Sequence, residues 1–218
     1  MTSLIDRLQN HEFESNVTLF QLVFYSVERE ICHAVIRRFP PIMDGPQLLN
    51  LGCAPHIYPG WVNADDYSIK RRLRERSFRP NWSLDITRPW KCSNEHWDGI
   101  FTEHVIEHVS MRACEHVSYS EAVKVFKECL RTLKPGAWRR VSVPDVAKYA
   151  QHDGVEQLSP DAPEFAARAL AISFATQMHL NRSAWDVTLM TRVLKETGFS
   201  EITAVSIWGG HRSTPDQG

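Results

Sequence analysis

Two stretches of the sequence decide the fold class, Leu130–Asp145 (LRTLKPGAWRRVSVPD) and Trp97–Val109 (WDGIFTEHVIEHV). The first predicts the end of a helix, a Lys-Pro-Gly turn and a strand that runs into Pro-Asp. The second predicts a strand that stops at a polar, acidic and histidine-rich edge. Two such units in series indicate a parallel sheet with a ligand at the ends of its strands.

The alternation of helices and strands continues over the rest of the chain. Helices are expected at Thr18–Phe39, Ser120–Thr132 and Val187–Thr197, and Gly198 occupies the usual cap position after the last of these. Short strands are expected at Leu48–Leu51, Trp61–Ala64, Trp82–Leu84, Asp98–Thr102, Trp138–Val143 and Glu201–Trp208. This pattern predicts an α/β domain over residues 46–218, preceded by a helical lead-in over residues 1–45.

Composition excludes several classes of protein. The chain has 218 residues, which suits one domain, and 43% of them are hydrophobic, too many for a disordered chain. The 25 Lys and Arg residues nearly balance the 26 Asp and Glu residues, so charge gives no reason to expect nucleic acid or membrane binding. No apolar run approaches the roughly 20 residues of a membrane span, and the N-terminus lacks a signal-peptide core, so we expect a cytoplasmic protein. Five cysteines without a CxxC pair argue for reduced thiols.

Polar residues stand at the carboxyl ends of the predicted strands. In chain order they are Gly52, Asp65, Asp85, Glu103 and Asp145. In a parallel sheet these ends meet at one edge, and ligands bind there. Several such residues in order therefore predict a ligand site at that edge.

Five motifs then carry a resemblance to a known family. LLNLGCA, GWVNADD, HVIEH, LKPGAWRRVSVPD and TGF resemble the LNLGCG, GWxNxD, HxxEH, LKPGGxLRxSVPD and AGF pattern of a bacterial group of class I S-adenosylmethionine-dependent methyltransferases. The resemblance covers about Leu48–Trp208, and the order and spacing of the motifs make it specific. It implies a Rossmann-like, doubly wound, mostly parallel sheet of six or seven strands with flanking helices, S-adenosylmethionine as the cofactor, and no metal.

The resemblance also implies which residues bind the cofactor. In the family, a glycine turn after the first strand approaches the methionine part, an acid after the second holds the ribose, and an acid after the third meets the adenine. The end of the fourth strand lies near the reacting methyl group. On this chain the first turn corresponds to Asn50, Gly52, Cys53 and Ala54, and the ribose acid to Asp65 or, alternatively, Asp66. The adenine acid corresponds to Asp85, with Ile86 beside it, and the end of the fourth strand to Thr102, Glu103 and His104. A turn or helix cap is the alternative role for Asp85.

The chain departs from the family pattern near its first motif. Ala54 replaces the usual second glycine and adds a methyl group where the backbone approaches the cofactor. Asp65 follows Gly52 sooner than the about 20 residues typical of dinucleotide-binding units, so the first crossover helix is expected to be very short or absent. The missing G-x-G-x-x-G disfavours an NAD dehydrogenase.

The acceptor side is expected to involve Glu107, His108, Asp145 and His179. A hydroxyl acceptor benefits from a general base with a pKa near neutrality, so His104, His108 and His179 are candidate bases. The resemblance implies O-methylation of a small or sugar-containing acceptor, in a setting such as surface glycan biosynthesis. The basic residues of Lys70–Arg79 form either a solvated helix face or a patch for an anionic or nucleotide-linked sugar.

Three further interpretations compete with this one. His104-Val105-Ile106-Glu107-His108 also matches the H-x-x-E-H motif of zinc hydrolases, which requires both histidines on one face of a helix. Alternatively, Glu107 and His108 only cap a helix and line a rim. Ala54 and the short C-terminal end favour a methyltransferase-like accessory domain that has lost catalysis.

Overall fold

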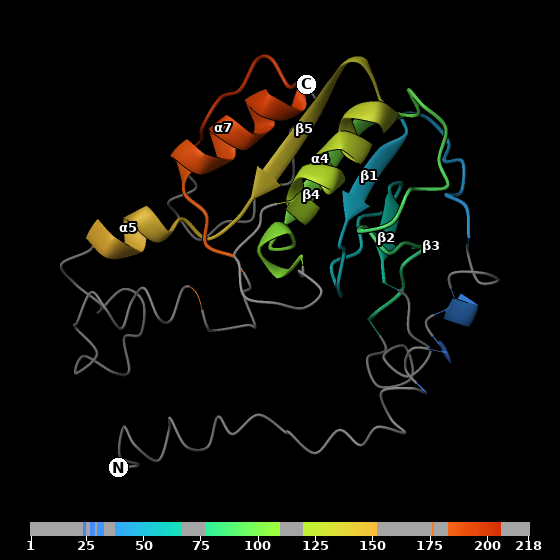
Figure 1. The fold of residues 1–218 in the computed structure, drawn as a ribbon. Coiled ribbons are helices and arrows are strands. Elements are labelled where there is room, and N and C mark those ends of the chain that lie inside the picture. The colour runs from blue at the N-terminus through green and yellow to red at the C-terminus, as the bar shows by residue number, and fades with distance from the viewer. Residues whose placement is uncertain are drawn as a thin grey trace. The chain divides into compact units, whose positions relative to one another are not determined.

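A sheet of five parallel strands organises the chain (Figure 1). The computed structural model describes residues 24, 27–28, 30–32, 38–66, 77–109, 120–151, 176 and 183–205. The strands lie in the order β3-β2-β1-β4-β5, and their bounds are β1 Leu48–Leu51, β2 Val62–Asp65, β3 Trp82–Ser83, β4 Trp97–Glu103 and β5 Leu133–Ser142. This is the strand order of Rossmann-like folds, and it confirms the predicted α/β class.

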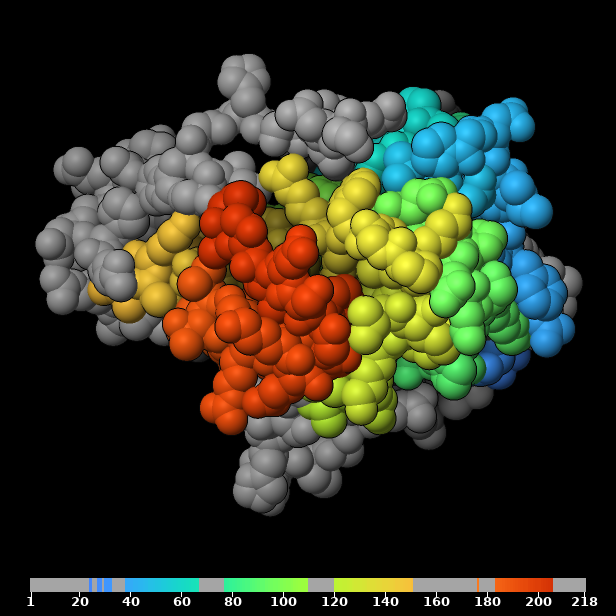
Figure 2. Space-filling view, turned by 90° about the horizontal axis from the view of Figure 1, so that it is seen from above, coloured from blue at the N-terminus to red at the C-terminus, as the bar shows by residue number. Residues whose placement is uncertain are grey.

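The chain divides into two compact units, Met1–Val105 with Arg131–Ser142 and Ile106–Leu130 with Val143–Gly218. The sheet belongs to the first unit. The second contains most of helix α4 (Ser120–Thr132), the 3-10 turn η1 (Ile106–His108), α5 (Val146–Gln151) and α7 (Val187–Thr197). Within this second unit α4 and α7 lie side by side (Figure 1, Figure 2).

The largest difference from the predicted strands is at β5. This strand begins at Leu133, opposite Trp97, but pairs regularly only from Trp138, which lies opposite Gly99. The predicted Lys-Pro-Gly turn is contained in this irregular start, with Gly136 at a φ of 74°. The sixth strand predicted at Glu201–Trp208 does not form over 201–205, and 206–208 lie outside the described residues. The described chain thus has five strands rather than six or seven.

Both longer helices begin and end where the sequence predicts. Asp186 caps α7 by accepting a hydrogen bond from the Leu189 N–H at 2.7 Å, and Gly198 ends the helix at a φ of 111°. Gly198 is the left-handed C-cap that the sequence predicts, and Asp186 is an N-cap that the sequence analysis did not name. The helical spacing of the sequence predicts Val123, Phe126, Leu130 and Leu133 on one apolar side of α4. The buried apolar face consists instead of Ala122, Val125, Phe126 and Cys129, so the prediction is wrong in part.

The predicted helix at Thr18–Phe39 is described at a few positions only. Residues 24, 27–28 and 30–32 are helical, and the others up to residue 37 lie outside the described residues. The division into a lead-in over 1–45 and a domain over 46–218 stays a prediction. Within the described ranges, no helix combines the length and the apolar composition needed to cross a bilayer.

A charged cluster adjoins buried aromatic residues at the amino ends of β4 and β5. The His96 ring meets the fully buried Trp97 ring edge-on, with centroids 4.4 Å apart. Asp98 accepts hydrogen bonds from Lys134 Nζ and from the Gln47 N–H, both at 2.7 Å. The Lys134 bond, followed by the Gln47 bond, lowers the pKa of Asp98. Burial, followed by the positive charge of Lys134, lowers the pKa of His96.

Stability between about pH 7 and about pH 5 is expected to depend on His96. Unfolded His96 takes up a proton near its ordinary pKa of about 6.5, whereas folded His96 does so only at lower pH. Its contribution to the free energy of unfolding is therefore complete above that pH and is lost as the pH falls. His96→Gln should flatten this fall in urea denaturation at a series of pH values. Asp98→Asn should not change how steeply the free energy of unfolding falls with pH in this window, because a carboxyl titrates near or below about pH 4. An equally steep fall in His96→Gln would contradict the prediction.

Candidate functional site

A sharp turn follows β1 at Gly52, as the sequence predicts. Gly52 has a φ of 71°, and the N–H groups of Gly52 and Cys53 both donate to the Ala64 carbonyl, at 2.8 and 3.0 Å. A Cβ atom at Gly52 would lie 2.2 Å from Val105 Cγ2, in the loop after β4. The backbone conformation and the close approach of Val105 therefore both require glycine here.

The carboxylate of Asp65, the last residue of β2, binds this turn. Asp65 Oδ2 accepts from the Ala54 N–H and Oδ1 from the Asp66 N–H, both at 2.7 Å. In dinucleotide-binding folds an acid after the second strand accepts hydrogen bonds from ribose hydroxyls. Asp65 and Asp66 are both partly buried, and the choice between them as the ribose ligand stays open.

Ala54 has a φ of 45°, in the left-handed region that favours glycine. We expect Ala54→Gly to raise the free energy of unfolding by about 0.5–1 kcal/mol, because relief of the Cβ strain exceeds the added freedom of the unfolded chain. Urea denaturation measures this change. Ala122→Gly, inside α4, is the control and should cost about 1 kcal/mol or more. A comparable loss in Ala54→Gly would show that Ala54 is not strained.

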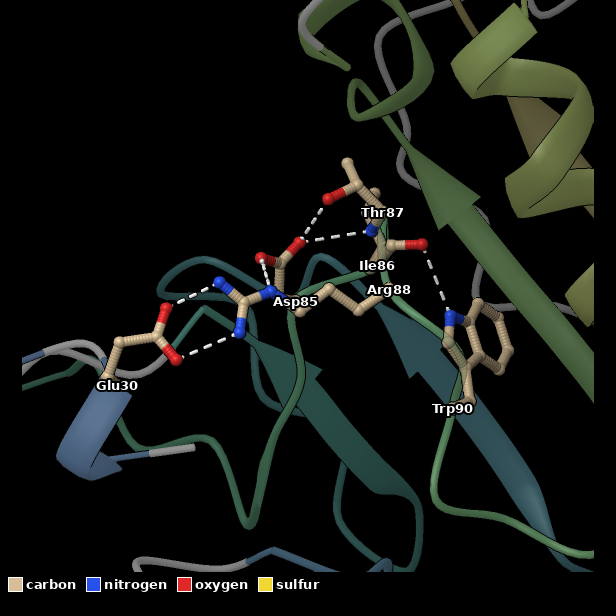
Figure 3. A network of polar contacts seen from close by, with 6 residues as sticks. All are labelled: Glu30, Asp85, Ile86, Thr87, Arg88 and Trp90. Atoms are coloured by element: carbon tan, nitrogen blue, oxygen red, sulfur yellow. Dashed lines mark hydrogen bonds and ion pairs between the residues drawn. The ribbon is translucent and has the colours of Figure 1, made fainter. Parts of the chain in front are cut away.

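Asp85 closes a polar turn directly after β3 (Figure 3). Its Oδ1 accepts from the Thr87 N–H at 3.1 Å and from Thr87 Oγ1 at 2.6 Å, while its Oδ2 lies 3.1 Å from Arg88 Nε. Ile86 accepts a hydrogen bond from Trp90 Nε1 through its carbonyl oxygen, at 3.2 Å. These contacts match the turn-cap role for Asp85, and the adenine role stays a prediction.

Arg88 connects the same turn to the N-terminal helical segment, as Figure 3 shows. Its Nη1 and Nη2 donate to the two carboxylate oxygens of Glu30, at 2.9 and 2.5 Å. The hydrogen bond to Glu30 is the main reason that the pKa of Arg88 is raised, and the charges of Asp85, Glu30 and Asp66 add to it. Sequence reasoning did not single out Arg88, because an arginine three residues after an acid is a common local pattern.

The end of β4 carries three residues predicted to line the cofactor. Thr102 is fully buried, and its Oγ1 has no hydrogen-bond partner among the residues that the structure describes. Glu103 is partly buried, whereas His104 is exposed, has a φ of 51° and donates its N–H to the Ser142 carbonyl at 3.0 Å. Thr102 lies opposite Leu51 in the neighbouring β1. The end of β4 and the Gly52 turn therefore share one edge of the sheet.

His104 and His108 do not share a helix face. His104 is a left-handed residue outside any helix, and only Ile106–His108 form a 3-10 turn. The zinc interpretation required an α-helix that carries both histidines, so this premise is wrong. Over the described ranges, no group of three or more His, Cys, Asp or Glu residues is arranged to hold a metal. Glu107 is buried and His108 is partly buried.

Asp145 acts as the cap of α5. Its Oδ1 accepts from the N–H groups of Ala147 and Lys148, at 3.1 and 3.4 Å, and its backbone forms a bridge with Trp185. This is a structural role, and its predicted contact with the acceptor stays a prediction. His179 and positions 70–76 of the basic stretch lie outside the described residues.

The connection between β1 and β2 contains no helix, in agreement with the short spacing of Gly52 and Asp65. All residues from 52 to 61 are described, and none is helical.

Asn50, predicted to bind the cofactor, is buried and donates to the His56 carbonyl at 2.7 Å and to Asn63 Oδ1 at 3.0 Å. The sequence analysis included Asn63 in the GWVNADD motif but assigned it no role, although an asparagine inside an apolar strand is unusual and was the available signal.

The comparisons with known proteins give structural neighbours only. No protein-family model matches the chain, and neither does any curated protein. One similar solved structure is an S-adenosylmethionine-dependent methyltransferase from Archaeoglobus fulgidus, with 16% sequence identity and a TM-score of 0.47; the match covers 84% of this chain and 75% of that one. Another is an S-adenosylmethionine-dependent methyltransferase from Mesorhizobium loti, with 13% identity and a TM-score of 0.42, over 78% of this chain and 81% of that one. The CurJ carbon methyltransferase is similar at 13% identity and a TM-score of 0.45, over 95% of this chain and 54% of its own. Scores this low carry no argument about activity, so the fold class rests on the strand order.

Proposed function

We propose that the protein is an S-adenosylmethionine-dependent methyltransferase whose cofactor binds at the carboxyl edge of β1, β2 and β4. The observation that carries the proposal is the Asp65 carboxylate, 2.7 Å from the Ala54 N–H and beside the left-handed turn at Gly52. An acid at this position accepts hydrogen bonds from ribose hydroxyls, and a glycine turn lets the ligand approach the backbone. The motif resemblance described above agrees with this placement.

The missing crossover helix favours a nucleoside without phosphate groups. In dinucleotide-binding folds the pyrophosphate binds the N-terminus of the helix after the first strand. Residues 52–61 form no helix here, so this edge lacks the helix N-terminus that would bind a phosphate. S-Adenosylmethionine has no phosphate and carries a positive sulfonium, so its charge suits this edge.

The residues at the edge fit such a ligand. Asp65 places a carboxylate where an acid binds the ribose in dinucleotide folds. The buried Thr102 Oγ1, which lacks a partner among the described residues, is the kind of group that a ligand satisfies. The cofactor, when bound, supplies an activated methyl group. The protein positions the acceptor and, for a hydroxyl, removes its proton.

We further propose a hydroxyl acceptor on a small or sugar-containing molecule, as in surface glycan biosynthesis. Support comes from the motif resemblance and from His104, an exposed imidazole directly after β4. His108 and His179 are the alternative bases. Incubation with S-adenosylmethionine and a panel of nucleotide-linked and phosphorylated sugars, followed by mass spectrometry, tests this part. Methylation of amines alone would contradict it.

Cofactor binding is tested by thermal unfolding and isothermal titration calorimetry with S-adenosylmethionine and S-adenosylhomocysteine. A ligand at about 100 times its Kd should raise the free energy of unfolding by about 2.7 kcal/mol. NAD and ATP serve as phosphate-bearing controls and should have no effect. If neither sulfur compound stabilises the protein, the proposed function is wrong.

Asp65→Asn is expected to weaken S-adenosylhomocysteine binding by about 10- to 100-fold, because charge-assisted hydrogen bonds contribute about 1.5–3 kcal/mol each. Asp66→Asn is the matched control and should change the Kd by less than about threefold. The reverse result assigns the ribose to Asp66. Unchanged binding in both variants would contradict a ribose site at the end of β2.

A second candidate function is a methyltransferase-like accessory domain that binds the cofactor without transferring its methyl group. The left-handed Ala54, at a position where the family has glycine, favours this alternative. Cofactor binding without turnover on the acceptor panel would support it. Turnover that appears in Ala54→Gly would identify Ala54 as the cause.

A further inference from the structure

Asn63, in the middle of β2, has an unusual set of contacts for a strand residue. It is 2% exposed, and its side-chain amide forms hydrogen bonds through every donor and acceptor site it has. Oδ1 accepts from the Tyr58 N–H at 2.9 Å and from Asn50 Nδ2 at 3.0 Å. Nδ2 donates to the carbonyls of Tyr58 and Trp61, both at 3.0 Å. A buried amide satisfied in this way holds its partners in a single geometry.

The side chain of Asn63 pairs with Tyr58 as a peptide group of a neighbouring strand would. It accepts from the Tyr58 N–H and donates to the Tyr58 carbonyl, and so fixes both polar groups of one residue in the middle of the connection. Asn50 extends this support to the His56 carbonyl, at 2.7 Å. Asn81 supports Asn63 from the other side, because its Oδ1 accepts the Asn63 N–H at 2.7 Å.

The neighbouring residues of β2 hold the first part of the same connection. The Ala64 carbonyl accepts from the N–H groups of Gly52 and Cys53, and the Asp65 carboxylate accepts from that of Ala54. Three successive residues of β2 thus bind the connection along its length, and Asn63 is the one that does so with an uncharged side chain. In an ordinary βαβ unit, a crossover helix satisfies the backbone groups of this segment.

We propose that Asn63 is a positioning residue that takes the place of the missing crossover helix and holds the Gly52–Ala54 turn in the conformation that binds the cofactor. This inference rests on the proposed function, because it concerns the same site. Asn63 does not touch the ligand in this scheme. It acts through Tyr58 and Asn50 on residues 52–61, and it leaves the Asp65 carboxylate to the ribose.

Asn63→Asp is the most direct test, because it preserves the shape of the side chain and removes its two N–H donors. The carboxylate would face the Tyr58 and Trp61 carbonyls, so the connection should detach from β2. We expect S-adenosylhomocysteine to bind about 10- to 100-fold more weakly, since small displacements in a binding site have effects of this size. Hydrogen exchange of the amides in residues 52–61 should accelerate, while that of β4 should not change.

Gln47→Ala is the matched control. The side-chain amide of Gln47 also holds a loop, through hydrogen bonds to Met43 and to the Gly45 carbonyl at 2.8 to 3.0 Å, but it lies just before β1, at the opposite end of the strand from the Gly52 turn. It should lower the midpoint of thermal unfolding and change the Kd by less than about threefold. All titrations are made at a temperature where circular dichroism shows each variant folded. If Asn63→Asp does not fold, Asn63→Ser, which keeps a hydroxyl at this position, replaces it.

The outcomes separate the two proposals. Binding by the wild type, with weak binding and fast local exchange in the Asn63 variant, supports the inference. Binding of equal strength by the wild type and the Asn63 variant overturns the inference and leaves the proposed function intact. An equal loss of affinity in Gln47→Ala also overturns it, because the effect would then follow general loss of stability. Failure of the wild type to bind either sulfur compound overturns the proposed function and this inference together.

Discussion

Gly52→Ala is expected to lower the free energy of unfolding by about 2–5 kcal/mol and to abolish S-adenosylhomocysteine binding. Two penalties add. A φ of 71° strains any residue with a Cβ atom, and that atom would lie 2.2 Å from Val105 Cγ2 and 2.9 Å from Val105 Cγ1. Either Val105 moves or the turn moves, and a moved turn breaks the bonds from Gly52 and Cys53 to the Ala64 carbonyl. Urea denaturation and calorimetric titration measure the two effects.

Gly60→Ala separates the two penalties. Gly60 has a φ of 78° in the same connection, but among the described residues other than its own chain neighbours no atom lies within 4 Å of a Cβ placed there. It should therefore show the backbone strain alone, about 1–2 kcal/mol, and retain ligand binding. Adding Val105→Ala to Gly52→Ala should recover part of the lost stability. If Gly52→Ala costs no more than Gly60→Ala, contact with Val105 does not constrain the turn.

Gly99→Ala is expected to lower the free energy of unfolding by about 1–3 kcal/mol. Trp138 of β5 lies across Gly99 of β4, so that an added Cβ would be 2.3 Å from Trp138 Cε2 and 2.4 Å from Cζ2. The indole must then turn away and lose its packing against Trp61, whose ring centroid is 6.1 Å away. Urea denaturation measures the loss, and the fluorescence of Trp138 should shift as its surroundings change.

A double-mutant cycle tests the physical reason for this loss. Gly99 has no positive φ, so alanine is acceptable to the backbone at this position. In a Trp138→Ala background, Gly99→Ala should be neutral or stabilising by about 0.5–1 kcal/mol, because glycine weakens a strand. If the change costs the same in both backgrounds, Trp138 is not the cause of the loss.

Local signals predicted α4, α7 and most strands correctly. Asp186 and Gly198 define the two ends of α7, and caps of this kind depend on residues within one helical turn. The irregular start of β5 was not predictable, because it depends on which residues of β4 lie opposite Leu133 and Trp138. The buried face of α4 was wrong in part for a similar reason, since packing partners select the face from several similar apolar spacings.

In the candidate site, too, the sequence identified some residues correctly but did not predict the contacts of their side chains. Motif order and spacing identified Gly52 and Asp65, and the structure brings them together through the Ala64 carbonyl and the Ala54 N–H. The contacts of Asn50, Asp85 and Asp145 are visible only in the structure, where the first donates to backbone groups of the connection and the other two close turns or helix ends. A carboxylate at a strand end has the same sequence signature whether it binds a ligand or a neighbouring N–H.

The sequence by itself determined that this is a parallel α/β protein, that a glycine turn follows its first strand, and that no full crossover helix fits before Asp65. These features depend on periodicity, spacing and backbone preferences, which are properties of short segments. Only the tertiary structure decided the strand order, the covering of Gly52 by Val105, and the use of Asn63 to hold residues 52–61. Such contacts join residues that are distant in sequence or separated by an irregular loop, and hydrogen bonds of this kind exist only once the strands have paired.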